Sequence, residues 1–284
     1  MSCHLVRGDS SLEKKKRINF HWGFMPEKQY ISAILDISDR DEYLSVQEIS
    51  ADTGIPNGGI SGKVIPHIWY AKYMGLIDFE KKEKKYLLKK TKLGELILQE
   101  DFGLQEPLSL LLCHAMIVRK KNGADVWHVI FHEILPQYHS TIKKDLLMRE
   151  VEQRFNTKVT MKTLTPFFRS YEKMFFDIGI LSVSDDKIQL LKASFNQDFI
   201  YVYAYILFEY WDEKFENQQE ISSIQLDELQ FEKTFGWTKQ EEYEILEHLS
   251  DKGFIRLNRQ LMPYTILRLV EKEHILKKLY SELC

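Results

Sequence analysis

The chain has 284 residues, enough for one large or two to three small domains, and its 44% hydrophobic and 29% charged content predicts a packed protein. Its formal net charge is -3, which excludes a protein that coats nucleic acid over its whole surface, so any nucleic-acid role has to come from a local basic patch. No apolar run reaches the about 18 residues of a membrane helix, and the 3 cysteines form no CxxC pair. We therefore expect a cytoplasmic protein with reduced thiols and no membrane partner.

The first predicted elements are two helices. The segment from Pro26 to Ser38 places apolar residues at helical spacing. Ser45 and Glu48 are then spaced as a capping box, in which the serine accepts from the third helical amide and the glutamate reaches back. They predict a short helix, VQEISADTG, that ends at Gly54. A glycine-rich turn follows this helix.

A third helix and a hairpin come next. The helix is predicted to end at Gly75, because glycine adopts the left-handed C-cap conformation without strain. Residues 76–79 and 85–88 are predicted as two short strands joined by the loop EKKEK, and TKLGELILQE is predicted as a further helix. The order of helix, short capped helix, turn, longer helix, hairpin and helix predicts a winged helix-turn-helix.

The same pattern recurs twice. Residues 160–192 and 238–269 each contain a helix, a glycine (Gly179 or Gly253), an apolar pair and a short hairpin. The predicted fold is therefore mainly α with short β-hairpins, arranged as tandem winged helix-turn-helix-like modules. The predicted divisions are a polar tail at 1–19, an N-terminal winged helix-turn-helix at 20–103, a helical middle domain with a degenerate winged-helix unit at 104–198, and a C-terminal winged-helix-like domain at 199–284.

Two groups of residues in the first unit are predicted to bind double-stranded DNA. In a winged helix, the second helix enters the major groove and the wing meets phosphates. The predicted groove contacts are Lys63, His67 and Lys72, with Asn57 and Ser61 at the helix start. The predicted phosphate contacts are the hairpin lysines Lys81, Lys82, Lys84, Lys85, Lys89 and Lys90.

Other interpretations of the hairpins stay open. Lysines also keep a solvated hairpin soluble and guard its edge, and winged helices also dock proteins. The second hairpin, SVSDDK, is acidic and is not predicted to bind DNA. In the third, Arg256 and Arg259 are placed either to reach phosphates or to pair with the glutamates of the preceding helix.

No motif predicts catalysis. His128 and His132 lie four residues apart and precede Glu133, so one helix could offer two imidazoles to zinc, with Cys113 and His114 as further candidates. The order HxxxHE differs from the HExxH of metalloproteases, and a core helix with histidines at its edge explains the pattern equally. We therefore predict no cofactor and no enzymatic activity.

Apolar stripes in the second half predict core helices. The segment from Phe199 to Trp211 is the most apolar of the chain, and its length suits a buried helix. Another group of aromatic residues lies at helical spacing and is predicted to form a core face and not a base-stacking platform. These are Phe167, Phe168, Tyr171, Phe175 and Phe176.

The chain resembles the bacterial domain-of-unknown-function family 4007. The resemblance rests on FHWGFMP before the first helix, LQEPLSLLLCHAMI from Leu104, DVWHVIFHEI after it, a T-x-K-x-D start at Thr141, and the C-terminal ILEHLSDKGFIRLNRQLM. It spans roughly residues 20–270. Members are encoded beside phosphoadenosine-phosphosulfate-reductase-like genes in DNA phosphorothioation and phage-defence islands. In place of the family's GHETF opening, this chain has Arg17 to Gly23.

The resemblance implies an accessory, DNA-binding role in a modification or antiviral defence system, with no catalytic residues to carry over. Two alternatives remain. One is a scaffold whose winged helices dock a partner enzyme of such a system. The other is a transcription regulator, which would prefer one operator sequence.

Overall fold

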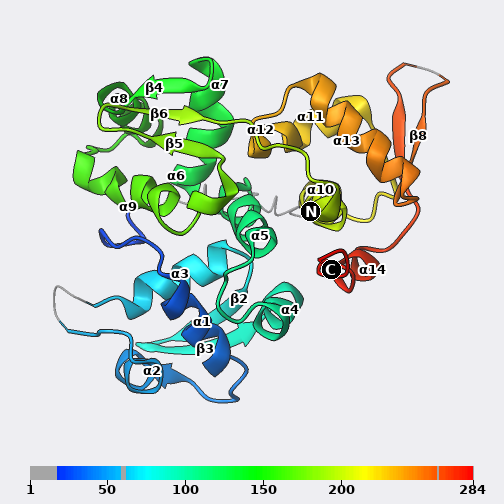
Figure 1. Cartoon of the computed structure of the whole chain (residues 1–284). Coiled ribbons are helices and arrows are strands. Elements are labelled where there is room, and N and C mark those ends of the chain that lie inside the picture. Colours follow the sequence, from blue (N-terminus) through cyan, green and yellow to red (C-terminus); the bar gives the residue numbers. More distant parts are fainter. Residues whose placement is uncertain (1–17, 59–61, 261, 284) are drawn as a thin grey trace, which may run out of the picture.

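The computed structural model describes residues 18–58, 62–260 and 262–283 (Figure 1). It is mainly helical with short hairpins, as predicted, and these residues form three small antiparallel sheets. In each sheet, the third strand along the chain lies in the middle. The strands are β1 (Leu44–Ser45), β2 (Ile77–Lys82), β3 (Lys85–Lys90), β4 (Thr141–Lys143), β5 (Leu181–Val183), β6 (Lys187–Leu190), β7 (Glu220–Ser222), β8 (Ile255–Asn258) and β9 (Thr265–Arg268).

The helices are mostly short. The first half contains α1 (Lys28–Ile37), α2 (Val46–Thr53), α3 (Val64–Tyr73), α4 (Lys92–Glu100), α5 (Pro107–Val118), α6 (Asp125–His128), the π-helix η2 (Val129–Ile134) and α7 (Leu135–Gln137). The second half contains α8 (Lys144–Phe155), α9 (Met161–Glu172), the 3-10 helices η3 (Phe176–Ile178) and η4 (Gln197–Phe199), α10 (Ile200–Lys214), α11 (Ser223–Leu229), α12 (Phe231–Phe235), α13 (Lys239–Asp251) and α14 (Lys272–Leu276).

One sequence of elements occurs three times: a short strand, two helices and a hairpin whose second strand pairs with the first strand. The first unit is β1, α2, α3, β2 and β3, and the second is β4, α8, α9, β5 and β6. The third is β7, α11, α13, β8 and β9, with α12 inserted between its helices. The three hairpins and the helices α2, α3, α9 and α13 were predicted, whereas α8, α11 and the first strand of each unit were not. A strand of two or three residues carries no period of its own.

Local signals at the start and end of the helices of the first unit act as predicted. The Glu48 amide donates to Ser45 Oγ over 3.2 Å, and the Ser45 amide donates to Glu48 Oε2 over 2.7 Å. At the end of α3, Gly75 has φ +72°, and the Leu76 amide reaches back to the Ala71 carbonyl over 2.9 Å. This left-handed cap reverses the chain directly into β2.

The first hairpin is longer than predicted. The expected loop EKKEK lies mostly within the strands, because Lys81 pairs with Tyr86 and Lys82 with Lys85, leaving only Glu83 and Lys84 in the turn. The lysine stems explain this extension: Lys81 Nζ lies 5.3 Å from the ring centroid of Tyr86. Charged residues that cover aromatic rings can thus continue a strand that hydrophobic alternation would end.

Helix α5 lies at the centre of the molecule, with the first unit on one side and the second and third units on the other (Figure 1). Every residue from Leu108 to Val118 is buried. The helix contacts α3 of the first unit, η3 beside β5 of the second, and α6 and α10, so it packs the units together. Helix α10 is also buried over most of its length, as predicted.

The predicted aromatic core face is confirmed for four of its five members. Phe167, Phe168, Tyr171 and Phe175 are buried, whereas the Phe176 side chain is 68% exposed. The prediction for Phe176 is wrong because α9 ends at Glu172, so the helical period no longer sets its direction.

Two carboxylates are buried together in the third unit. Glu232 and Glu242 are 7% and 2% exposed, and Lys239 Nζ lies 3.1 and 2.9 Å from them. Burial, followed by the neighbouring Glu232 charge, raises the pKa of Glu242 from 4.5 to about 7.

We expect Gly94→Ala to destabilise the protein, although alanine in a helix interior normally stabilises by about 1 kcal/mol. A Cβ at Gly94 would lie 1.9 Å from the Leu76 carbonyl oxygen, so α4 has to move away from the end of α3. The expected loss is about 1–3 kcal/mol in the free energy of unfolding, measured by chemical denaturation. Gly103→Ala is the control, because its Cβ would meet only the Gln105 side chain, at 3.3 Å. Equal stabilities of the two variants would contradict the close contact.

We expect Glu242→Gln to stabilise the protein at pH 8 more than at pH 5. Because the folded-state pKa of Glu242 is raised, the group favours folding fully below pH 4.5 and loses this contribution as the pH rises through about 7. The glutamine side chain stays neutral at every pH and so avoids the loss of stability that follows ionisation of Glu242. The free energy of unfolding at pH 8 therefore rises by up to about 3 kcal/mol. Denaturation at both pH values measures the difference, with the exposed Glu244→Gln as control. A pH-independent effect would exclude a shared buried charge.

Candidate nucleic-acid interface

Helix α3, the predicted groove-reading helix, is buried on most of its surface. It packs against α1, α2, α5 and β2. Its partly exposed residues are Ile65, Trp69 and Lys72, which are spaced along one side and are called here the outer strip of α3. Two of these three side chains are apolar. The helix therefore offers few of the polar groups that read base edges in a major groove.

His67, a predicted groove contact, is completely buried. Its Nε2 accepts from the Glu27 amide over 3.1 Å, and its Nδ1 lies 2.7 Å from the Lys63 carbonyl, to which it donates. Burial lowers its pKa to about 4, so the ring is neutral. His67 thus joins α3 to the start of α1 and is unavailable to a base in this structure, so we leave it out of the interface.

The two predicted groove lysines are held by carboxylates. Lys63 Nζ lies 2.7 Å from Glu27 Oε1 and over the rings of Phe24 and Tyr30. Lys72 Nζ lies 2.5 Å from Asp78 Oδ1 on β2. Either lysine would have to leave its partner before it could contact DNA.

The predicted hairpin lysines fall into two groups. Lys85, Lys89 and Lys90 have acidic partners: Lys85 Nζ lies 3.9 Å from Glu48, Lys89 Nζ 2.9 Å from Asp41, and Lys90 Nζ 3.0 Å from Asp39.

The other three, Lys81, Lys82 and Lys84, are exposed, and none forms an ion pair with a residue in the described parts of the chain. Lys82 Nζ lies 4.6 Å from the Tyr43 ring centroid, and its pKa is raised by the Tyr43 hydroxyl and, to a smaller extent, by the Glu80 charge. These three residues, at the tip of the first hairpin, are called the tip lysines below.

The remaining predicted contacts lie in the turn before α3. Asn57 is partly exposed. Ser61 lies outside the described residues. The structure therefore places Asn57, Lys63 and the hairpin lysines in one unit, but it brings only the tip lysines together as exposed charges without acidic partners.

Two of the three arginines of the third hairpin are paired with carboxylates. Arg259 Nη2 lies 2.7 Å from Glu247 Oε1, so of the two roles left open for this residue, pairing with α13 is the one present. Arg268 is mostly buried, and its Nη1 lies 2.5 Å from Asp212 Oδ1. Arg256 is exposed.

His128 and His132 stack at 4.6 Å between ring centroids, on α6 and the π-helix that continues it. Their Nδ1 atoms lie 2.9 Å from the Val118 carbonyl and 3.3 Å from Gln230 Oε1. Burial lowers the pKa of both, so both rings are neutral. Across 18–58, 62–260 and 262–283, no group of three or more His, Cys, Asp or Glu residues could hold a metal ion, so the zinc alternative gains no third ligand there.

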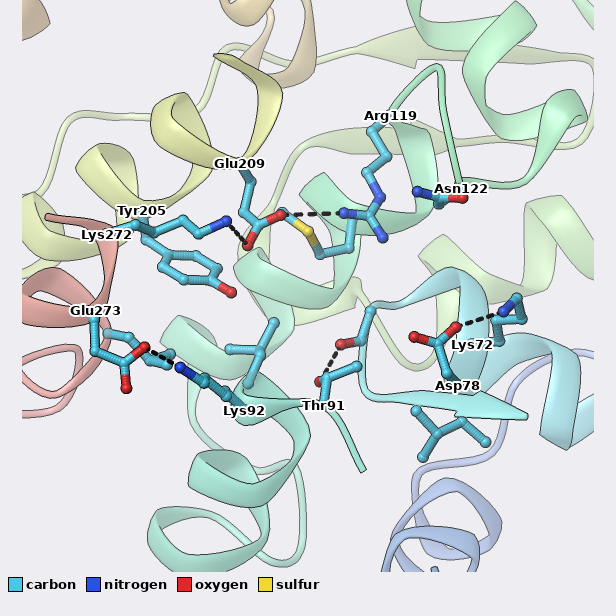
Figure 2. A pocket seen from close by; sticks show the side chains of 15 residues that line it. Lys72, Asp78, Thr91, Lys92, Arg119, Asn122, Tyr205, Glu209, Lys272 and Glu273 are labelled. Atoms are coloured by element: carbon cyan, nitrogen blue, oxygen red, sulfur yellow. Dashed lines mark hydrogen bonds and ion pairs between the residues drawn. The ribbon is translucent and has the colours of Figure 1, made fainter. Parts of the chain in front are cut away.

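A cavity of about 550 Å³ lies where the first unit meets α5, α10 and α14 (Figure 2). Its charges are paired across the elements. Lys92 Nζ lies 2.6 Å from Glu273 Oε2, and Glu209 binds both Lys272, at 3.0 Å, and Arg119, at 3.5 Å. These ion pairs connect residues far apart in the sequence, so we interpret the charged lining as a seam that holds the units together.

Sequence reasoning missed a second cavity, of about 400 Å³, on the first unit. It lies between the segment before α1, the outer strip of α3 and the inner face of the hairpin, and its walls are mainly aromatic. We call it the aromatic cavity; it is lined by Phe20, Trp22, Trp69, Phe79, Tyr86 and Lys81, among others. The aromatic residues in FHWGFMP were the available sequence signal for this cavity. Their contact with α3 and the hairpin could not be predicted, because it joins residues that are far apart in the sequence.

Among the described residues, no helix is long and apolar enough to cross a membrane. No family model matches the chain, and no curated protein matches it. The resemblance to domain-of-unknown-function family 4007 therefore stays a prediction.

Two solved structures are similar. A magnesium ion-bound SspB crystal structure matches with a TM-score of 0.73 and 16% identity, over 97% of this chain and 90% of that chain. A second SspB crystal structure matches with the same TM-score and identity, over 93% and 86%. At this identity the likeness shows the fold alone, and it extends over nearly the whole chain.

Proposed function

We propose that this protein is a non-catalytic DNA-binding accessory protein of a bacterial DNA modification and phage-defence system of the phosphorothioation type. It binds duplex DNA through its first unit, which we interpret as a winged helix-turn-helix with β2 and β3 as the wing. The observation that carries the proposal is the group of tip lysines, Lys81, Lys82 and Lys84, exposed beside α3 and without ion-pair partners among the described residues.

The arrangement of charge supports phosphate binding. An exposed lysine without an acidic partner attracts anions with its full charge. Each lysine that neutralises a phosphate releases a condensed counterion from the duplex. The other hairpin lysines all lie on β3 and have acidic partners in Glu48, Asp41 and Asp39. Lysines without ion-pair partners among the described residues thus gather at the tip, which they share with the exposed Glu80 and Glu83, and a wing approaches the DNA backbone through its tip.

The system is suggested by two kinds of likeness. The resemblance to domain-of-unknown-function family 4007 implies an accessory role beside phosphorothioation genes. The second likeness is the fold, which this chain shares with SspB over nearly its whole length. At 16% identity, it assigns no function to individual residues. The absence of a predicted catalytic motif supports a binding role and not a chemical one.

The geometry of α3 favours weak sequence preference. Lys63 and Lys72 are paired with carboxylates, and the outer strip is mostly apolar. Affinity would come mainly from phosphate contacts, which position a protein without reading the base sequence. This expectation separates the proposal from a transcription regulator, which would bind one operator more tightly than other duplexes.

The rival function is a scaffold that docks a partner enzyme. Exposed apolar side chains on the second and third units favour it, since Phe176 is 68% exposed and Ile224 is 60% exposed. A scaffold would form a stable complex with its partner while showing no affinity of its own for DNA. Fluorescence anisotropy with purified protein and labelled duplex at two salt concentrations distinguishes the two.

We expect the triple variant Lys81→Gln, Lys82→Gln, Lys84→Gln to bind duplex DNA more weakly and with a flatter salt dependence. Each lost phosphate contact should reduce the slope of log affinity against log salt by about 0.9. Loss of three contacts therefore lowers the slope by up to about 3, with a similar weakening on every duplex sequence. Anisotropy titrations at several salt concentrations measure both quantities.

The matched control is Lys85→Gln, Lys89→Gln, Lys90→Gln, which removes the same number of charges from β3 of the same hairpin. Because acidic partners already neutralise these lysines, their loss should change the slope much less. Equal slopes for the two triple variants would show that overall charge, and not the tip, attracts the DNA. No binding by the unmodified protein, even at low salt, would reject the proposed function.

A further inference from the structure

We infer that the aromatic cavity of the first unit holds an unstacked DNA base, so that the protein prefers DNA containing a locally unpaired nucleotide. This inference rests on the proposed DNA binding and adds to it the structural class of DNA that is bound. The cavity, of about 400 Å³, has the size of a small-molecule site and room for one flat heterocycle.

Trp22 forms the open wall of this cavity. Its side chain is 53% exposed. No ring contact or hydrogen bond of the indole is present among residues 18–58, 62–260 and 262–283, so its faces are available for stacking. A large aromatic side chain left this open has no role in the core, and exposed aromatic faces are what single-strand-binding proteins use to stack bases.

The backbone holds Trp22 in this position. The Gly23 amide donates to His21 Nδ1 over 3.0 Å, and the Phe24 amide donates to the His21 carbonyl over 2.8 Å. His21 itself is 1% exposed and packs against Trp127. Trp22 has φ +49°, a left-handed conformation that is unfavourable for a bulky residue. A strained residue on a turn that a buried side chain holds in place is typical of binding positions.

Three other rings of the lining form a continuous aromatic surface. Trp69 on the outer strip of α3 meets Phe79 edge to face at 4.9 Å between ring centroids, and Phe79 meets Tyr86 in the same way at 5.6 Å. The surface therefore runs from the helix across both strands of the hairpin. Its rings are held by one another, which makes this wall rigid before any ligand arrives.

Charge identifies the occupant. Lys81 lines the cavity and is also one of the tip lysines, so the aromatic walls end directly at a cation that has no ion-pair partner among the described residues. A nucleotide combines a flat ring with an adjacent phosphate, which matches aromatic walls followed by Lys81. An apolar side chain of a protein partner would fill the walls but would leave the lysine without a counterpart.

The inference also explains the outer strip of α3. Ile65 and Trp69 are unsuited to hydrogen bonding with base edges, but they suit contact with the face or edge of an extruded base. In a fully paired duplex such a base must first unstack, at a cost of a few kcal/mol, and an unpaired base avoids much of this cost. The preference for unpaired DNA follows from that difference.

The test uses the full-length chain and two labelled DNA probes of equal length. One is a fully paired duplex, and the other is the same duplex with a central bulge of unpaired thymidines. The expected result is tighter binding of the bulged probe, by about fivefold to 100-fold, the range that stacking of one base on an aromatic ring provides. Trp22→Ala should bring the affinity for the bulged probe down to that for the paired duplex, and Trp22→Phe should retain most of the preference.

Phe176→Ala is the matched control, since Phe176 is an exposed aromatic residue of the second unit, and its loss should leave both affinities unchanged. Thermal melting shows that each variant is folded. An unchanged preference in Trp22→Ala, or no preference in the unmodified protein, overturns the inference and favours a protein side chain as occupant.

The proposed function has a separate outcome. Binding of the paired duplex that still depends on Lys81, Lys82 and Lys84 would keep the proposed function even where the inference fails. Absence of binding to both probes at low salt would overturn both.

Discussion

The burial of α5 is the constraint on which the rest of the structure depends. A helix that is apolar on all sides cannot face water, so each unit has to supply part of its cover. The first unit supplies α3, and the contact is close: a Cβ at Gly75 would lie 3.0 Å from Met116 on α5. Because α1, α2, α5 and β2 occupy most of α3, only a narrow strip of the supposed reading helix remains for any partner.

This constraint limits how the first unit, under the proposed function, would engage DNA. A free recognition helix presents several polar side chains to the major groove. Here the inner face of α3 is committed to the core, and two of its polar residues, Lys63 and His67, bind the start of α1. What remains exposed is the hairpin tip and the aromatic cavity. Under the proposed function, binding would therefore depend less on reading base edges than on holding phosphates and stacking on one base.

The sequence predicted those features that short-range signals determine. The capping box of Ser45 and Glu48 and the left-handed Gly75 involve residues within a few positions of one another, and both are present as predicted. The burial of α5 and α10 was also predictable, because a helix formed by a continuous apolar run has no polar face to turn toward the solvent. The predicted divisions of the chain into modules stay predictions.

Contacts between distant residues set the limits of prediction. His67 appeared as an exposed polar residue on a helix, but its partner, the Glu27 amide, lies 40 residues earlier. The lysine run of the hairpin looked uniform in sequence, yet Asp39 and Asp41, about fifty residues away, neutralise part of it. Likewise, Trp22 became a candidate only once the turn before α1 was seen beside the hairpin. Periodicity cannot supply these pairings, since each depends on how the elements pack.

The three units also differ in how they use charge, and this difference argues for the first unit as the binding one. In the third unit, Arg259 is held by Glu247 and Arg268 by Asp212, so both cations stabilise the fold. In the second, the hairpin turn carries Asp185 and Asp186, which would repel phosphate. Only the first hairpin combines exposed lysines without ion-pair partners in the described chain with an aromatic cavity beside them. Under the proposed function, one repeated architecture would thus serve packing in two units and partner binding in the first.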